Sequence, residues 1–343
     1  MFDLRKKRAL QAAAVALMIA MTAGCAATDG GGLKSGSGNT DVATGGAHFK
    51  TADEETAKLG STAKPGVFPR EVKHSEGTTE IKAKPKRVVV LDTGELDDVL
   101  ALGITPVGIP STEGANSVPG YLADRVKDAT GIGTIQEPNL EAIAALKPDL
   151  ILGSKLRADK LYPQLSQIAP TVFSIRPGFP WKENLRLVAA ATGDEDKAVS
   201  LLNEYQAEAD KLRADIPGNP TISLLRFMPQ KTRLYGNASL IGVILKDVGL
   251  ARPKIQDIDE LATEISSENL AQAEGDWIFY TSYGTPEATG ESAALAGPIW
   301  PTLDAVKNKH VQRVDDDVWY LGLGPIGAGK ILKDLRTYLV PSK

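Results

Sequence analysis

Residues 139–154 read NLEAIAALKPDLILGS and residues 267–282 read SENLAQAEGDWIFYTS, and these two similar stretches decide the expected fold. When Glu141 is aligned with Glu268, Asp149 falls on Asp276, and each copy then continues into a short apolar run. Each copy predicts a short helix with a glutamate in its first turn, followed by a buried strand. The repeat therefore indicates two similar lobes. A single first-turn glutamate is commonly just an acid favoured by the helix dipole, so only the matched pair suggests a function.

The rest of the chain predicts an α/β protein with two Rossmann-like lobes joined by a long helical spine. The apolar run RVVVLD at 87–92 is typical of a strand covered on both faces, and a hairpin is expected around Gly77. Apolar residues recur at helical spacing through 183–214, where Asp194 is the expected N-cap of a helix of about twenty residues. Further strands are expected at 105–109, 149–152, 171–175, 221–227, 311–314 and 318–321, and a terminal helix at 330–339. The predicted segments are a lipoprotein signal peptide (1–24), a flexible tether (25–66), an N-terminal lobe (67–178), the spine (179–217) and a C-terminal lobe (218–343).

The N-terminal residues predict export and lipid attachment. Four basic residues at 5–8 precede an apolar run at 9–23 that is too short to span a bilayer comfortably. Residues 22–25, TAGC, resemble a lipobox, although Thr22 stands where leucine is more usual. Cys25 is the only cysteine of the chain and is the expected lipid attachment site. We therefore expect a protein anchored to the outer face of the cytoplasmic membrane.

Composition and histidine spacing disfavour several other classes of protein. The chain has 343 residues, is 42% hydrophobic and carries a net charge of −4 without a basic stripe, which argues against nucleic acid as a partner. The three histidines, His48, His74 and His310, lack the spacing of metal ligands. The run GPIGAGKI at 324–331 nearly matches a phosphate-binding loop, but Ile331 replaces the required Ser or Thr. We expect a monomer without a cofactor.

Several motifs follow one another over about residues 86–339: KPKRVVVLD, LALGITPVG, NLEAIAALKPDLILGS, LSQIAPTVF, ISSENL with GDWIFY, and PIWPTLDAVKNKHVQRVD. Their order and spacing resemble the class III substrate-binding proteins of ABC importers. The resemblance is closest to the FecB-like iron-siderophore lipoproteins of actinobacteria, because of LLRFMPQKTRLYGNASLIGVILKDVGLARP at 224–253. It implies a non-catalytic protein that delivers a ferric siderophore to a permease, and it implies that Glu141 and Glu268 dock onto permease arginines.

The ligand is expected beyond the carboxyl ends of the strands, as in other open α/β sheets. A ferric siderophore presents polarised oxygens and apolar arms, which arginine and aromatic side chains suit. Arg226 is the leading candidate, and the alternative for it is an ion pair with an acid of its own lobe. Tryptophans are more often core residues than ligand contacts. The full set of candidates is Arg157, Arg176, Trp181, Arg226, Tyr235, Tyr283 and Trp319.

Three alternative functions remain open at this point. Haem or a corrinoid could bind the same fold, with Tyr235 or Tyr283 as an axial ligand of haem. An exported α/β hydrolase is disfavoured because the chain lacks a GxSxG elbow and has few histidines. A cell-envelope scaffold that has lost transport would retain the fold but bind no chelate.

Overall fold

Two five-stranded sheets form the frame of the protein in the computed structural model, which describes residues 51–114 and 116–341. The first sheet is parallel throughout, in the order β5-β4-β3-β6-β7. The second has the order β10-β9-β8-β11-β12, and its strand β9 runs antiparallel to both neighbours. The expected α/β class with two similar lobes is confirmed. The strands are β3 (Val88–Val90), β4 (Gly108–Ser111), β5 (Thr130–Thr134), β6 (Leu150–Ser154), β7 (Thr171–Ser174), β8 (Ile222–Met228), β9 (Lys231–Tyr235), β10 (Ala262–Ile265), β11 (Trp277–Ser282) and β12 (Val311–Arg313).

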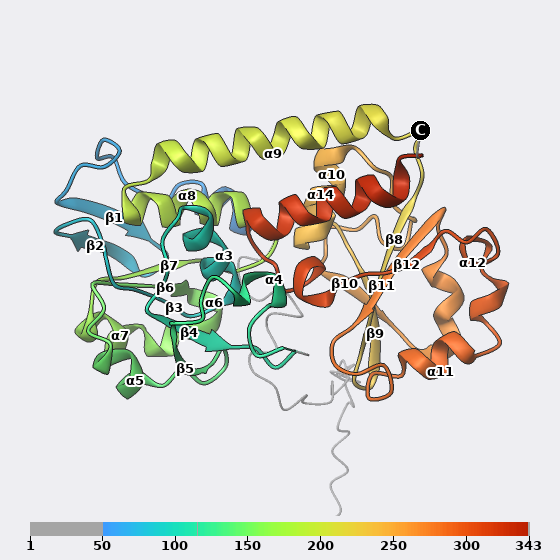
Figure 1. Cartoon of the computed structure of the whole chain (residues 1–343), viewed down its shortest axis with the longest axis horizontal. Helices are drawn as coiled ribbons and strands as arrows, with labels where there is room; N and C mark the ends of the chain where they lie inside the picture. Colours follow the sequence, from blue (N-terminus) through green and yellow to red (C-terminus); the bar gives the residue numbers. More distant parts are fainter. Residues whose placement is uncertain (1–50, 115, 342–343) are drawn as a thin grey trace, which may run out of the picture. The chain divides into compact units, whose positions relative to one another are not determined.

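Short helices connect the strands of each lobe (Figure 1). Left-handed glycines follow two of these helices, Gly103 after α3 and Gly249 after α10, with φ of 82° and 74°. The first lobe contains α3 (Thr93–Ala101), α4 (Gly120–Ala123), α5 (Leu140–Ala145), α6 (Lys155–Ala158), η2 (Asp159–Leu161) and α7 (Tyr162–Ile168). The second contains α10 (Leu240–Val248), η3 (Ser267–Ala273), α11 (Glu291–Ala296), η4 (Trp300–Thr302), α12 (Asp304–Lys307) and α13 (Asp316–Trp319).

The spine consists of two helices, α8 (Trp181–Thr192) and α9 (Glu195–Asp215), as the helical spacing predicts. Gly193, with φ of 76°, separates them. Helix α9 packs on α8, on α10 and on the terminal helix α14 (Pro325–Leu339), so it contacts elements of both lobes (Figure 1). Asp194 lies at the predicted N-cap position, but its carboxylate accepts a hydrogen bond from Lys84 (2.6 Å) and makes no capping bond. Helix α14 also packs on α3 of the first lobe and on α8 of the spine, so the C-terminal segment is not confined to the second lobe.

The repeated aspartates perform the same structural task in each lobe. The Asp149 carboxylate accepts hydrogen bonds from the backbone N–H groups of Lys86 (2.8 Å) and Arg87 (2.8 Å), just before β3. The Asp276 carboxylate accepts from the backbone N–H and the hydroxyl of Thr221, both at 2.7 Å, just before β8. Because β6 pairs with β3 and β11 pairs with β8, each aspartate joins the starts of two neighbouring central strands. This shared role gives a physical reason for the repeat.

The folded part begins earlier than the predicted tether boundary at residue 66. Helix α2 (Ala52–Thr56) packs on α8 and buries both Ala52 and Thr56. Arg70, which is also buried, donates hydrogen bonds to the carbonyls of Lys64 and Ala190, both at 2.7 Å. Residues 51–66 are therefore held against the first lobe, and that part of the tether prediction is wrong. The predicted signal peptide, Cys25 and His48 lie outside the described residues.

A two-stranded hairpin precedes the first sheet, and its position is as predicted. Strands β1 (Arg70–His74) and β2 (Gly77–Ile81) pair antiparallel, with Gly77 at a φ of 127°. Among the described residues, no helix is both long enough and apolar enough to cross a membrane.

The strand predicted at 318–321 is wrong, because these residues lie in and just after helix α13. The Asp315 carboxylate accepts the backbone N–H of Asp317 (3.0 Å) and so starts the helix. The apolar run VWYL reads as a strand by periodicity, whereas the preceding acids are a helix-start signal. Strands β5, β9 and β10 are absent from the sequence prediction.

Candidate ligand-binding cleft

Arg226 is the centre of a polar and aromatic cluster near the carboxyl end of β8. Its guanidinium makes a bidentate ion pair with Asp316 of α13, at 2.7 and 2.5 Å, and donates to the Tyr235 hydroxyl at 3.2 Å. The rings of Tyr283 and Tyr320 lie 4.6 and 5.0 Å from its central carbon. The predicted alternative, an ion pair with an acid of the same lobe, is therefore present in this structure.

The charge of Arg226 is secured by these neighbours. Burial by itself lowers the pKa of Arg226, but the charge of Asp316 and the neighbouring Tyr235 raise that pKa above its ordinary value. Arg226 as a whole residue is 6% exposed. Arg226 therefore stays positively charged. A ligand that binds its guanidinium group must compete with Asp316, its ion-pair partner.

Arg157 and Arg176 lie at the corresponding edge of the first sheet. Arg157 of α6, the helix that follows β6, donates to the Asp92 carboxylate at 2.9 Å, and Asp92 also caps α3. Arg176 follows β7 and stacks on Phe179, with 5.3 Å between its central carbon and the ring centroid. Burial, and then the positive charge of Arg157, lowers the pKa of Arg176 to about 10, so Arg176 remains a cation at neutral pH. Two cations of the first lobe therefore lie close together at the strand ends.

Tyr283 lies where the two clusters meet. Burial raises the pKa of its hydroxyl, while the charges of Arg226 from its own lobe and Arg157 from the other lobe oppose that rise. A Cβ atom placed on Gly114, in the loop after β4, would lie 3.5 Å from the Tyr283 ring. Five of the seven predicted ligand residues thus belong to two facing groups, one from each lobe.

The two tryptophan candidates are contradicted by the structure. Trp181 is 0% exposed and packs edge-on against Tyr205 of the spine, with ring centroids 4.8 Å apart. Trp319 is also 0% exposed, stacks on Phe279 and donates its indole N–H to Asp334 at 2.8 Å. Neither side chain has a surface to offer a ligand, because both complete the apolar core.

Asp316, Tyr320 and Arg233 belong to the cleft region but are absent from the seven predicted candidates. Tyr320 falls within the false strand at 318–321, and Asp316 lies just before it. Arg233 of β9 is directly opposite Arg226 in the antiparallel register, so the two side chains share one face of the sheet. It donates to the Glu264 carboxylate at 2.9 and 3.0 Å. The run of three aspartates at 315–317 was the available signal for Asp316.

Glu141 and Glu268 occupy the matching positions that the repeat predicts. Glu141 lies in the first turn of α5 and Glu268 in the first turn of η3, and both side chains are exposed. The pKa of the Glu268 carboxyl is lowered by a hydrogen bond from the backbone N–H of Glu268 and then by the Ser266 and Ser267 hydroxyls. Both groups are therefore available to a partner, and their docking role stays a prediction.

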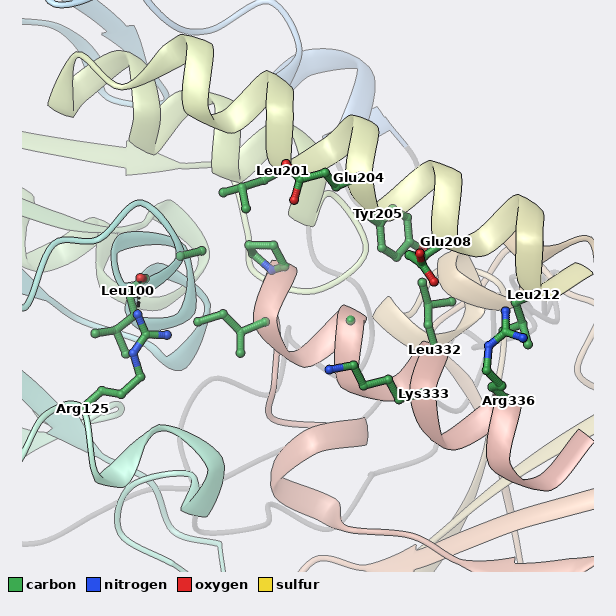
Figure 2. Close-up of a pocket in the computed structure, with 14 residues that line it drawn as sticks. Leu100, Arg125, Leu201, Glu204, Tyr205, Glu208, Leu212, Leu332, Lys333 and Arg336 are labelled. Carbon is green, nitrogen blue, oxygen red and sulfur yellow. Dashed lines mark hydrogen bonds between the residues drawn. The ribbon is translucent and has the colours of Figure 1, made fainter. Parts of the chain in front are cut away.

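A separate hollow of about 430 Å³ lies between α3, α9 and α14. Figure 2 shows apolar side chains such as Leu201 and Leu332 in it, with charged groups such as Glu208 and Lys333 at its edge. None of the predicted ligand residues lines this hollow. We therefore place the candidate site at the strand ends, where the arginines gather.

The described histidines have structural surroundings. Burial lowers the pKa of His74 to about 4, and its ring is hydrogen-bonded to the Thr79 hydroxyl at 2.9 Å. His310 stacks on Trp277, with centroids 4.4 Å apart. Within 51–114 and 116–341, no group of three or more His, Cys, Asp or Glu side chains is arranged to hold a metal ion.

The family model described as periplasmic binding protein matches residues 88–318. The chain belongs to the periplasmic binding protein family. Members of this family are substrate-binding components of transporters. The predicted resemblance to class III substrate-binding proteins of ABC importers is confirmed.

Three relatives show how far the similarity extends across the periplasmic binding protein family. The probable siderophore-binding lipoprotein YfiY of Bacillus subtilis is 37% identical over 289 residues, which cover 80% of this chain and 89% of YfiY. The Fe(3+)-citrate-binding protein YfmC of the same organism is 33% identical over 255 residues, covering 73% of this chain and 79% of YfmC. The structure of Staphylococcus aureus SirA complexed with staphyloferrin B superposes with a TM-score of 0.70 at 34% identity, covering 78% of this chain and 98% of SirA.

Proposed function

We propose that the protein captures a ferric siderophore outside the cytoplasmic membrane and delivers it to an ABC permease. The observation that carries this proposal is the facing arrangement of Arg226 and Tyr283 from one lobe with Arg157 and Arg176 from the other. Ligands of open α/β sheets bind at this edge. The names of the relatives, which include siderophore-binding and ferric-citrate-binding proteins, support the same substrate class.

The chemistry of the cleft suits a chelate rather than a free metal ion. A siderophore supplies the oxygen ligands of its own iron, so the protein needs hydrogen-bond donors and flat apolar surfaces. Guanidinium groups donate charge-assisted hydrogen bonds worth about 1.5 to 3 kcal/mol each, and the Tyr283 ring offers an aromatic face. A chelate oxygen that reaches Arg226 competes with the Asp316 carboxylate, which accepts two of the guanidinium hydrogen bonds in this structure.

The test is binding of a panel of ferric siderophores, ferric citrate and hemin, followed by native mass spectrometry and tryptophan fluorescence. The wild type should bind at least one ferric siderophore. Arg226→Ala should weaken that binding at least about tenfold, because one lost bond is worth about 1.5 to 3 kcal/mol and each 1.4 kcal/mol is a factor of ten. Arg213→Ala is the matched control, because Arg213 lies at the end of α9 and donates to the Gly218 carbonyl. Equal affinities of Arg226→Ala and Arg213→Ala would remove Arg226 from the site, and a wild type that binds no chelate would overturn the proposed function.

Haem remains the second candidate because Tyr283 is a half-buried phenol in the cleft. Burial raises the pKa of Tyr283, however, which disfavours the phenolate form that ligates haem iron. Tyr235, the other candidate, is buried and bonded to Arg226. A Soret shift on titration with hemin, lost in Tyr283→Phe, would favour haem over a siderophore.

We also propose that the protein acts without catalysis, as a monomer anchored by a lipid on Cys25. Glu141 and Glu268 then contact arginines of the permease, one from each lobe. The similarity to a lipoprotein relative and the exposure of both glutamates support this arrangement. Labelling with a palmitate analogue, lost in Cys25→Ala, tests the anchor.

A further inference from the structure

The glycine-rich turn that resembles a phosphate-binding loop already holds an anion, the carboxylate of Asp97. The backbone N–H groups of Ile326 and Gly327, in the first turn of α14, donate to the two Asp97 oxygens at 2.7 and 2.9 Å. The Tyr121 hydroxyl donates to the same carboxylate at 2.6 Å. Asp97 lies on α3 of the first lobe and is 0% exposed. The donors that a phosphate group would need are therefore occupied by a residue of the chain itself.

Gly324, which begins this turn, and Gly322 just before it lie close to Asp97 and Tyr121. A Cβ atom on Gly324 would lie 2.7 Å from the Asp97 Cβ and 2.7 Å from its Oδ1. A Cβ atom on Gly322 would lie 2.9 Å from the Tyr121 hydroxyl. These distances are shorter than van der Waals contact, so the fit of α3 against the start of α14 explains the glycine at 324. A Cβ atom on Gly327 would lie 2.2 Å from the Gly322 carbonyl oxygen, so that glycine is required by the turn itself.

A second buried carboxylate, Asp317, connects the second lobe to the first. Asp317 of α13, in the second lobe, is 2% exposed and accepts hydrogen bonds from the first lobe. The donors are the Asn116 side-chain amide at 2.6 Å and the Gly120 backbone N–H at 2.8 Å. Asp97 thus reaches from the first lobe to α14, which also packs on α10 and α13 of the second lobe. Asp317 reaches from the second lobe to the loop before α4 and to the first residue of α4.

Both connections adjoin the candidate ligand cleft. Asp317 follows Asp316, the ion-pair partner of Arg226. The loop that Asp317 binds also contains Gly114, whose position lies against Tyr283 and Leu321 of the second lobe. Any change in how the lobes meet at these carboxylates would therefore move the arginine and the aromatic ring proposed to contact the ligand.

We propose that Asp97 and Asp317 form a reciprocal carboxylate clamp that fixes the spacing of the two lobes and thereby the geometry of the ligand cleft. Both are positioning residues, because their partners are backbone and side-chain donors of the opposite part of the fold. The link to affinity rests on the proposed function, whereas the link to lobe spacing does not.

The test measures lobe spacing without ligand and affinity with ligand, in the full chain. Cys25→Ser removes the only native thiol, and cysteines at the exposed positions Lys160 and Asn308 carry spin labels for distance measurement. Asp97→Asn should give a longer and broader distance distribution than the parent, and hydrogen exchange at Ile326 and Gly327 should accelerate. The affinity for the ferric siderophore selected in the panel should fall by about tenfold, as expected for a lost charge-assisted bond.

Matched variants separate the clamp from a general effect of altering a buried acid of α3. Asp98→Asn replaces the adjacent buried carboxyl group with an amide of similar shape and leaves the bonds between Asp97 and α14 in place, so its distance distribution should match the parent. Asp317→Asn weakens the second connection of the clamp, and Gly324→Ala places a Cβ atom against Asp97. These two variants test the clamp if Asp97→Asn fails to fold.

An unchanged distance distribution in these clamp variants would overturn the proposal. If the lobe spacing changes but the affinity for the chelate does not, the clamp does not set the geometry of the ligand cleft. If the wild type binds no chelate, the proposed function fails, and the distance measurements still decide the clamp.

Discussion

Glu95→Gln is the substitution whose effect on stability follows most directly from the structure. Glu95 lies on α3, is 4% exposed, and its Oε2 atom is buried without a hydrogen-bond partner. Burial, and then the negative charge of Asp92, raises the pKa of the Glu95 carboxyl to about 8, from an ordinary value of 4.5. The native protein therefore holds a proton on Glu95 at neutral pH, which the unfolded chain has released.

The sign and size of the effect follow from this difference. Between pH 4.5 and 8 the native state binds one more proton at Glu95 than the unfolded state, so stability falls as pH rises. The slope is about 1.4 kcal/mol per pH unit, which gives about 2.7 kcal/mol between pH 5.5 and 7.5. Glutamine has a similar shape and does not titrate. Glu95→Gln should therefore lose about 2.7 kcal/mol less than the wild type across this window, and it should be the more stable protein at pH 7.5.

Urea unfolding followed by circular dichroism at pH 5.5 and 7.5 measures both quantities. Some pH dependence should remain in the variant, because burial also raises the pKa of Asp97, to about 6, and that of Asp98. Glu71→Gln, on the exposed face of β1, is the control and should retain the wild-type pH dependence. If Glu95→Gln loses as much stability as the wild type over this window, the assignment of a proton to native Glu95 is wrong.

Three further outcomes test the repeat and the core. Charge reversal of both Glu141 and Glu268 to arginine should abolish uptake of the iron chelate in cells while its affinity for the purified protein stays unchanged; normal uptake would reject the docking role. Asp149→Ala and Asp276→Ala should each lower the free energy of unfolding by about 1 to 3 kcal/mol, because two donors at the start of a central strand lose their acceptor; a loss in only one variant would show that the copies are not equivalent. Trp181→Ala should cost about 3 to 5 kcal/mol of stability and leave chelate affinity intact in the folded fraction, and a large loss of affinity at full folding would return Trp181 to the ligand site.

The sequence predicted the central strands and the spine well because the signals for them are local. The apolar run RVVVLD indicates a strand buried on both faces, and the helical spacing of apolar residues through 183–214 indicates helices with one buried face. Prediction failed at 318–321, where an apolar run of strand character is short enough for the capping carboxylate of Asp315 to decide in favour of a helix. It also failed at residues 51–66, whose contacts with α8 depend on Arg70 and on distant carbonyls.

The sequence by itself determined a two-lobed α/β protein with a helical spine, matched exposed glutamates and arginines at strand ends. Only the tertiary structure decided which partner each charged group takes. Arg226 pairs with Asp316, 90 residues away, and Asp97 binds the start of α14, 229 residues away. Such pairs leave no periodic trace in the sequence, because they form only when separate elements pack and bury a charge that then requires a partner.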